Sequence, residues 1–132
     1  MTRPPCYIIA PYSAPTAAEI AANVARAEAL GRLAALSGYA PIVVHSMIGG
    51  VFASGELDDD PEARARGIEC DLALLRLVAK EPGGAAWVLL RDDGNASPGS
   101  ADEIGVWHDA RHDGLTEGTW AWWRQRMECV GA

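Results

Sequence analysis

The stretch CYIIAPYSAPT, residues 6–16, decides the fold, because it joins a short apolar run to a polar loop and a helix start. The run at 6–10 lies between prolines and is predicted to form a fully buried strand. Thr16 precedes Glu19 by three residues, which is the spacing of a capping box at a helix N-terminus. Apolar residues then recur at helical spacing as far as Gly38, a suitable C-terminal stop.

The same alternation continues along the chain. Apolar runs at 40–44 and 85–90 are predicted to be buried strands. Further helices are predicted from Asp60-Pro61 through Ala79, from about Ala101 to His112, and over 119–130. Buried strands that alternate with helices form parallel sheets with right-handed crossovers, so the predicted fold class is α/β with one parallel sheet and helices on both faces.

The composition, with 49% hydrophobic residues, favours a single compact domain that spans residues 1–132. There are 18 acidic and 11 basic residues, and the net charge of -7 disfavours gripping a nucleic-acid polymer. No apolar run approaches the ~20 residues of a membrane span, and the N-terminus lacks the apolar core of a signal peptide. The three cysteines form no C-x-x-C pair. We therefore expect a cytoplasmic protein without a membrane or nucleic-acid partner.

In such sheets ligands bind beyond the carboxyl ends of the strands, which directs attention to the loops at 11–15 and 91–100. Glu103 lies in the predicted first turn of the helix after the second loop. Its carboxylate either complements the helix dipole or, held charged by helix N–H groups, acts as nucleophile or base. Asp71 lies beside the apolar stripe of its helix. It is either an edge residue that reaches solvent or an acid of raised pKa that hands over a proton.

The loop Ser97-Pro98-Gly99-Ser100 brings two hydroxyls and a glycine to a helix N-terminus. This is either an ordinary capped loop or a cradle for an anion. No Lys follows the glycine, so the loop is not a Walker loop.

Four further residues lie where a ligand is expected. Tyr7, at the start of a strand, is either core or catalytic, whereas Tyr12 and Ser13 are on the ligand side and are candidates to line a pocket. His45 follows the second strand directly and is either structural or a pocket residue.

A metal site is not expected. His108 and His112 have metal-compatible spacing on one helix face, but no third ligand is evident and the H-E-x-x-H pattern is absent.

Five features, taken in order along the chain, resemble the nucleoside 2-deoxyribosyltransferase-like superfamily. They are YIIAPYS at 7–13, PIVVHS at 41–46, Asp71, WVL at 87–89 and Ser97-x-Gly99-x-x-x-Glu103. The resemblance covers about residues 6–113 and is closest to a small bacterial and phage branch. It implies a three-layer flavodoxin-like or Rossmann-like sheet. It also implies cleavage of the N-glycosidic bond of a small-molecule nucleotide or nucleoside, without a cofactor.

The resemblance also implies roles for individual residues. Glu103 would attack the anomeric carbon and hold a covalent glycosyl intermediate, Asp71 would assist departure of the base, and Tyr7 would position the glutamate. Ser97 occupies the position that is Ser in hydrolases of nucleoside 5′-monophosphates and Asp in transferases that act on free nucleosides. An Asp at this position would repel a 5′-phosphate, whereas Ser97, Ser100 and nearby N–H groups would bind one.

We therefore expect hydrolysis of a (deoxy)nucleoside 5′-monophosphate to free base and sugar phosphate. The alternatives are a nucleoside 2-deoxyribosyltransferase, which moves deoxyribose between bases, and a non-catalytic nucleotide-binding or sensing domain.

The chain departs from the superfamily pattern in two places. Pro11 replaces the Gly that is common after the first strand. The stretch 114–120 shows no apolar run for a further strand, which predicts a truncated sheet with a Trp-rich C-terminal helix. Trp120, Trp122 and Trp123 are core, interface or a stacking surface, and we favour an interface in a homodimer or higher homo-oligomer. An inactive descendant is a further alternative.

Overall fold

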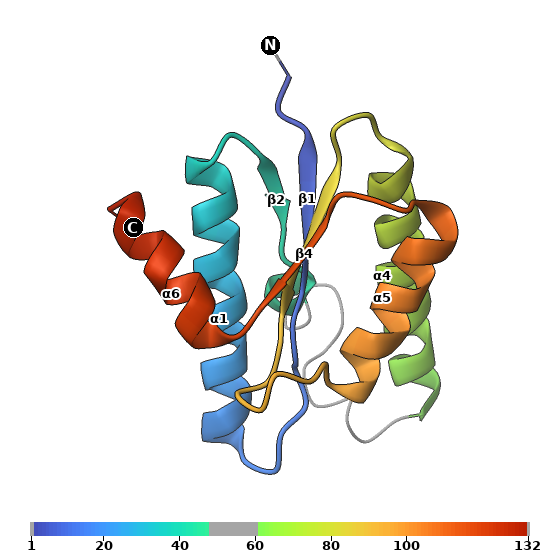
Figure 1. Ribbon diagram of the computed structural model, residues 1–132. Coiled ribbons are helices and arrows are strands. Elements are labelled where there is room, and N and C mark those ends of the chain that lie inside the picture. The colour runs from blue at the N-terminus through green and yellow to red at the C-terminus, as the bar shows by residue number, and fades with distance from the viewer. Residues whose placement is uncertain (1, 48–60, 132) are drawn as a thin grey trace.

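The computed structural model describes residues 2–47 and 61–131, which form a three-layer α/β domain (Figure 1). Four strands form one parallel sheet in the order β2-β1-β3-β4. The strands are β1 (Pro5–Ile9), β2 (Ala40–Ile42), β3 (Ala85–Leu89) and β4 (Leu115–Gly118). The helices are α1 (Ala17–Leu36), η1 (Val44–Met47), α4 (Pro61–Lys80), α5 (Pro98–Ala110) and α6 (Trp120–Cys129). The predicted parallel α/β sheet with helices on both faces is confirmed.

The two faces of the sheet carry separate apolar clusters. Helices α1 and α6 cover one face, and α4 and α5 cover the other (Figure 1). Side chains alternate along a strand, so Cys6 and Ile8 of β1 enter the α1/α6 cluster while Tyr7 and Ile9 enter the α4/α5 cluster. Tyr7 pairs in register with Ile42 on one side and with Ala86 on the other. A tyrosine is thus fixed at the centre of the sheet, facing α4 and α5.

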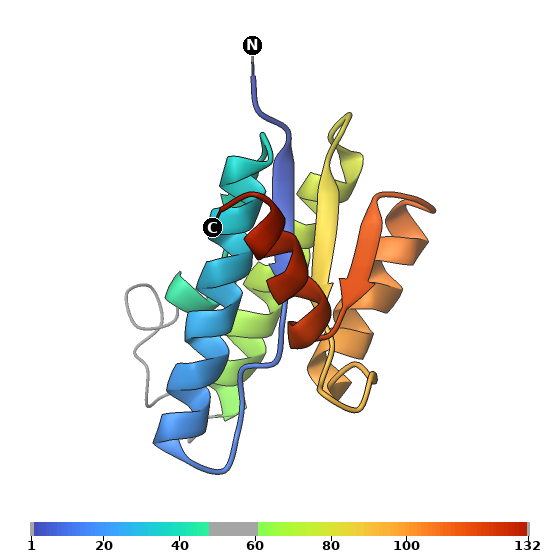
Figure 2. The same ribbon diagram turned by 60° about the vertical axis from the view of Figure 1, so that its left-hand side comes forward.

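The strand order places a topological switch between β1 and β3. The chain leaves β1 for β2 on one side and later returns to β3 and β4 on the other, and all four strands point the same way (Figure 2). The carboxyl ends of β1 and β3 therefore flank the crevice where ligands bind in sheets of this kind. The loops at 10–16 and 90–97 begin at these two ends.

Helix α1 begins and ends where the sequence predicts. The Thr16 hydroxyl accepts a hydrogen bond from Glu19 N at 3.2 Å, which confirms the N-cap. Gly38 has φ +98°, the left-handed conformation that favours glycine after a helix. In α4 the predicted stripe is buried at Leu75, Val78 and Ala79, but Ile68 is 50% exposed.

Some boundaries differ from the predictions. The second strand ends at Ile42 rather than at residue 44, and a 3₁₀ turn follows. Helix α5 starts at Pro98 rather than at Ala101, because the Ser97 hydroxyl caps it and proline is favoured as the first helical residue. Asp60, the predicted cap of α4, lies outside the described residues.

The expectation that 114–120 lacks a strand is wrong. Leu115–Gly118 forms β4, which pairs in parallel with β3 from Ala86↔Leu115 to Leu89↔Gly118. Two of its four residues, Thr116 and Glu117, are exposed. An edge strand of this kind has no continuous apolar run, so the sequence pattern does not reveal it.

The tryptophans of α6 belong mainly to the fold. Trp123 is 2% exposed, and its indole N–H donates to the Val88 carbonyl at 3.0 Å. The interface prediction is therefore wrong for Trp123, which is core. Trp120 and Trp122 are half-buried and pack against the same cluster, and a role for them in an interface stays a prediction.

None of the described helices is long and apolar enough to span a membrane.

Candidate functional site

The central feature of the site is a group of three acids from three elements, in which Tyr7 is fully buried and Asp71 and Glu103 are half-buried. Tyr7 comes from β1, Asp71 from α4 and Glu103 from α5. Glu103 and Asp71 each raise the pKa of the Tyr7 hydroxyl, and Asp71 raises that of Glu103. Helices α4 and α5 pack directly against each other above this face of the sheet. Three acids that are far apart in the sequence thus interact in one place.

Tyr7 and Glu103 influence each other through their hydroxyl and carboxyl groups as well as through charge. The Tyr7 hydroxyl acts as a hydrogen-bond donor towards the carboxyl and lowers the Glu103 pKa. The contact is only partly made, because Tyr7 Oη and Glu103 Oε2 are buried and complete no hydrogen bond within the described part of the chain. Buried polar atoms without full partners are uncommon in folded proteins and require an explanation. A ligand that supplies the missing hydrogen bonds is one such explanation.

Burial sets the protonation of both carboxyls. Desolvation raises the pKa of Glu103 to about 7, and the nearby charges of Asp71 and Asp102 add to the rise. Desolvation also raises the pKa of Asp71 to about 6. Two interacting carboxyls that titrate near neutrality hold about one proton between them there, so the pair titrates as a unit. Acid-assisted nucleophilic chemistry requires one charged and one protonated carboxyl. Because Glu103 has the higher pKa, the shared proton lies mainly on Glu103, and it must pass to Asp71 before Glu103 can attack.

The sequence interpretation of Glu103 needs one correction. Because α5 starts at Pro98, Glu103 lies in its second turn, beyond the free N–H groups of the helix start. The expectation that helix N–H groups hold the Glu103 carboxylate in its charged form is therefore wrong. Its surroundings instead favour the neutral form, and Tyr7 is the neighbour that favours the charge.

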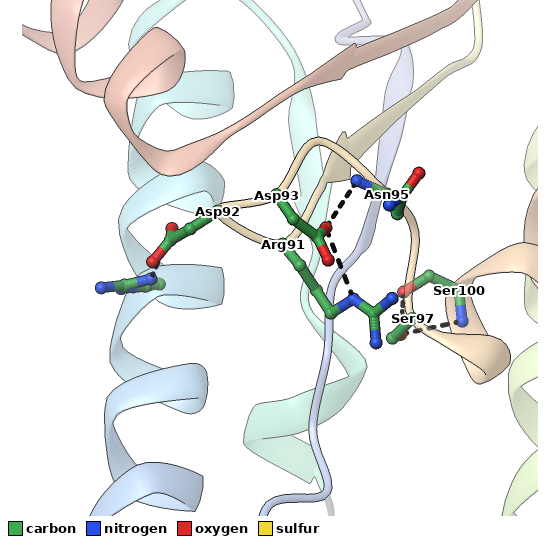
Figure 3. Close-up of polar contacts among 7 residues, drawn as sticks. Arg91, Asp92, Asp93, Asn95, Ser97 and Ser100 are labelled. Atoms are coloured by element: carbon green, nitrogen blue, oxygen red, sulfur yellow. Dashed lines mark hydrogen bonds and ion pairs between the residues drawn. The ribbon is translucent and has the colours of Figure 1, made fainter.

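A second group of candidates lies at the N-terminus of α5. The Ser97 hydroxyl donates to Ser100 Oγ at 2.9 Å and accepts from Ser100 N at 3.3 Å (Figure 3). Ser100 is 2% exposed, so its hydroxyl is an inner member of the cap rather than a surface group. Gly99 is exposed, and a Cβ added there would meet open space. The open donor of this loop is therefore the Gly99 N–H, and the Ser97 hydroxyl can donate to a ligand only by giving up its hydrogen bond to Ser100 Oγ.

Arg91 is a candidate that the motif analysis missed. It follows β3 directly, and its backbone N–H donates to the Asn95 carbonyl at 2.9 Å, which closes the turn of the loop. In Figure 3 its guanidinium extends towards the Ser97–Ser100 cap. Its ion pair with Asp93 is loose, at 3.8 Å. The signal in the sequence is a cation placed immediately after a buried strand of an acidic chain.

The third group lies where β1 and β2 end. His45 is 7% exposed, and its Nε2 lies 3.1 Å from the Pro11 carbonyl, to which it donates as Nε2–H. Burial lowers the His45 pKa, so the ring is neutral at pH 7, and its buried Nδ1 meets no donor among the described residues. Tyr12 is half-buried and packs edge-on against this ring, with centroids 5.4 Å apart, while Ser13 is exposed.

A hollow of about 390 Å³ lies apart from these groups. It is on the α1/α6 side, and its walls include Tyr39, Trp87, Trp122 and Arg126. None of the three acids lines it, and Tyr7 faces the opposite side of the sheet. We therefore assign the chemistry to the α4/α5 side. Across the described ranges, no three His, Cys, Asp or Glu side chains are grouped so as to hold a metal ion.

Comparison with known proteins gives one match. The profile of a family described as a domain of unknown function, DUF7768, matches residues 4–113. The matched segment runs from the start of β1 to beyond the end of α5, so it contains all three acids. No curated protein and no solved structure matches the chain significantly.

Proposed function

We propose that this chain, which belongs to the DUF7768 family, hydrolyses the N-glycosidic bond of a (deoxy)nucleoside 5′-monophosphate. The observation that carries the proposal is the mutual interaction of Tyr7, Asp71 and Glu103, which come from three elements. It agrees with the resemblance of the sequence to the nucleoside 2-deoxyribosyltransferase-like superfamily, in which the corresponding residues carry the reaction.

In the first step a Glu103 carboxylate oxygen attacks C1′ of the sugar. The C1′–N bond breaks, its electron pair goes to the departing base, and Asp71 supplies the proton that the base takes up. The product is free base and a sugar phosphate joined to Glu103 through C1′. The Tyr7 hydroxyl favours the ionised form of Glu103, which is the form that attacks.

In the second step water replaces the enzyme at C1′. Asp71, now ionised, takes a proton from the water, whose oxygen bonds to C1′ as the C1′–Glu103 bond breaks. Both carboxyls return to their starting states, and one water is consumed per base released. Two carboxyls that divide one hard displacement into two easier ones in this way are typical of retaining glycosidases.

The N-terminus of α5 supports a 5′-monophosphate rather than a free nucleoside. The Gly99 N–H offers an uncharged donor, the Ser97 hydroxyl offers another if it exchanges its hydrogen bond to Ser100 Oγ for one to the phosphate, and the Arg91 guanidinium extends towards them. No carboxylate stands at position 97 to repel a phosphate. This arrangement makes phosphate recognition the part of the proposal most easily separated from the chemistry.

The test is incubation with a panel of ribo- and deoxyribonucleoside monophosphates, followed by chromatography for free base. We expect base release that Glu103→Ala abolishes. Base release that persists unchanged in Glu103→Ala would overturn the proposal. Product that forms only after an acceptor base is added would indicate a transferase instead. Thermal stabilisation by nucleotides without turnover, in wild type and in Glu103→Gln alike, would indicate a sensing domain.

A further inference from the structure

Trp107 is the buried aromatic residue closest to Glu103 along α5. It lies four residues after Glu103, so the two side chains share one face of the helix. Trp107 is 0% exposed and belongs to the same cluster as Tyr7 and Leu75. Glu103 therefore shares its helix face with Trp107 and interacts with Tyr7, which belongs to the same cluster as the indole.

The C-terminal turn of α5 holds the indole in one orientation. Trp107 Nε1–H donates to the Asp113 carbonyl at 2.8 Å, and the Trp107 carbonyl accepts from Arg111 N at 2.7 Å. Gly114 has φ +83°, and a Cβ there would lie 3.3 Å from Trp107 Cζ2. The guanidinium of Arg111 ties the turn down through Asp113 and the Glu81 carbonyl.

We propose that Trp107 is a positioning residue for the chemistry at Glu103: its locked indole walls the inner side of the acid cluster and keeps water from that side of the carboxyl. This inference rests on the proposed function. A carboxylate that loses its water gains nucleophilic and electrostatic strength towards the cationic sugar of the transition state. The wall is apolar, so it acts through exclusion of water and leaves the charge of the cluster unchanged.

The pKa of Glu103 depends directly on how far Trp107 excludes water from the carboxyl. Desolvation is the largest cause of its raised pKa. The titratable groups that act on Glu103 are Tyr7 from β1, Asp71 from α4 and Asp102, the residue before Glu103 on α5. None of them is altered when Trp107 is replaced. A change at Trp107 that moves the Glu103 pKa therefore acts through solvation.

The test is a titration of the Glu103 carboxyl by ¹³C NMR, with the resonance assigned from its loss in Glu103→Gln. In Trp107→Phe we expect the midpoint to fall by about one pH unit, towards the ordinary glutamate value, because water enters beside the carboxyl. The matched control is Trp123→Phe. Trp123 is also fully buried and also donates its indole N–H to a backbone carbonyl, but it lies on the other face of the sheet. It should leave the midpoint in place.

A second variant covers the case in which Trp107→Phe does not fold. Gly114→Ala introduces a methyl against the edge of the indole, and the Glu103 midpoint should again fall. Gly38→Ala is its control, since Gly38 has a similar positive φ but nothing within 4 Å of an added Cβ. A Glu103 midpoint that stays unchanged in folded Trp107→Phe or Gly114→Ala, or that moves equally in the controls, would overturn the inference.

Activity gives a separate readout. If wild type releases base, the acid limb of its pH–rate profile should move to lower pH in Trp107→Phe by the same amount as the NMR midpoint. If wild type releases no base but the midpoint falls, the proposed function fails and the solvation role of Trp107 stands.

Discussion

The Tyr7 hydroxyl and the Glu103 carboxyl face each other inside the protein without completing a hydrogen bond, although the hydroxyl still favours the charged carboxylate. One residue is held by β1 at the centre of the sheet, and the other by the second turn of α5. A ligand that supplies the missing hydrogen bonds would stabilise a pair arranged in this way.

Glu103 should cost the fold stability above neutral pH. Its folded pKa of about 7 exceeds its ordinary value of 4.5, so between these values the folded state binds more protons than the unfolded state. The free energy of unfolding of wild type therefore falls as pH rises through this range, by at most about 3 kcal/mol, and levels off above it. Glu103→Gln lacks this titration, so its stability relative to wild type should increase from pH 4.5 to 7.5.

Urea unfolding at the two pH values measures this difference. Glu28→Gln, at an exposed position on α1, is the control for loss of one negative charge. A stability difference between Glu103→Gln and wild type that does not change with pH would contradict the assigned pKa.

Tyr7→Phe should raise the Glu103 pKa further. The change removes the hydroxyl that favours the carboxylate and leaves the ring in place in the sheet. We expect the acid limb of base release to move up by as much as about one pH unit. Measurement of kcat against pH checks this, with Tyr39→Phe on the other face of the sheet as control. An acid limb that stays in place in Tyr7→Phe would assign Tyr7 to packing alone.

Asp71→Asn should slow base departure by about 10²–10⁴-fold, because an amide supplies no proton. The loss should be smaller for nucleotides whose bases leave easily without protonation. Single-turnover rates across several bases measure this dependence. The control is Asp102→Asn, which removes an exposed acid that also acts on Glu103 through its charge. Equal losses in Asp71→Asn and Asp102→Asn would exclude Asp71 as the acid.

Gly99→Ala should weaken recognition of the 5′-phosphate without harming the fold. An added Cβ meets open space at Gly99 and equally at Gly105 of the same helix. Each alanine should stabilise the protein or leave it unchanged, since glycine is unfavourable within a helix by roughly 0.5–1 kcal/mol. A phosphate that approaches the Gly99 N–H would meet the new methyl, whereas Gly105 lies a turn and a half further along α5.

The measurement is kcat/KM for a nucleoside monophosphate and for its parent nucleoside. Gly99→Ala should lower the first by about tenfold and leave the second unchanged, as expected for loss of a charge-assisted hydrogen bond. If Gly99→Ala and Gly105→Ala change kcat/KM for the monophosphate equally, the phosphate does not bind at this loop.

Much of the architecture follows from local patterns in the sequence. The strand at 6–10 is a continuous apolar run, and the helix after it carries a capping threonine, so both are predictable from short-range chemistry. The strand at 115–118 cannot be predicted from short-range chemistry. Two of its four residues are exposed, and its pairing with β3 is a long-range interaction. The start of α5 was misplaced because the Ser97-Pro98 start signal was assigned to a loop.

The site was predictable in its members but not in its electrostatics. Helical spacing singles out Asp71, the helix start after the second loop singles out Glu103, and the superfamily resemblance gives Tyr7 its role as a candidate. The raised pKa values come from burial between α4, α5 and the sheet, which depends on how the helices pack. Arg91 was missed because its direction towards the α5 cap depends on the course of the loop at 91–97.

The most direct test of the account is intact-mass and peptide mass spectrometry after rapid acid quench of the protein with a nucleoside 5′-monophosphate that is cleaved. The account predicts one added sugar phosphate per chain, located on the peptide that contains Glu103 and absent in Glu103→Gln. Base release at the wild-type rate by Glu103→Gln, or an adduct on another residue, would contradict it.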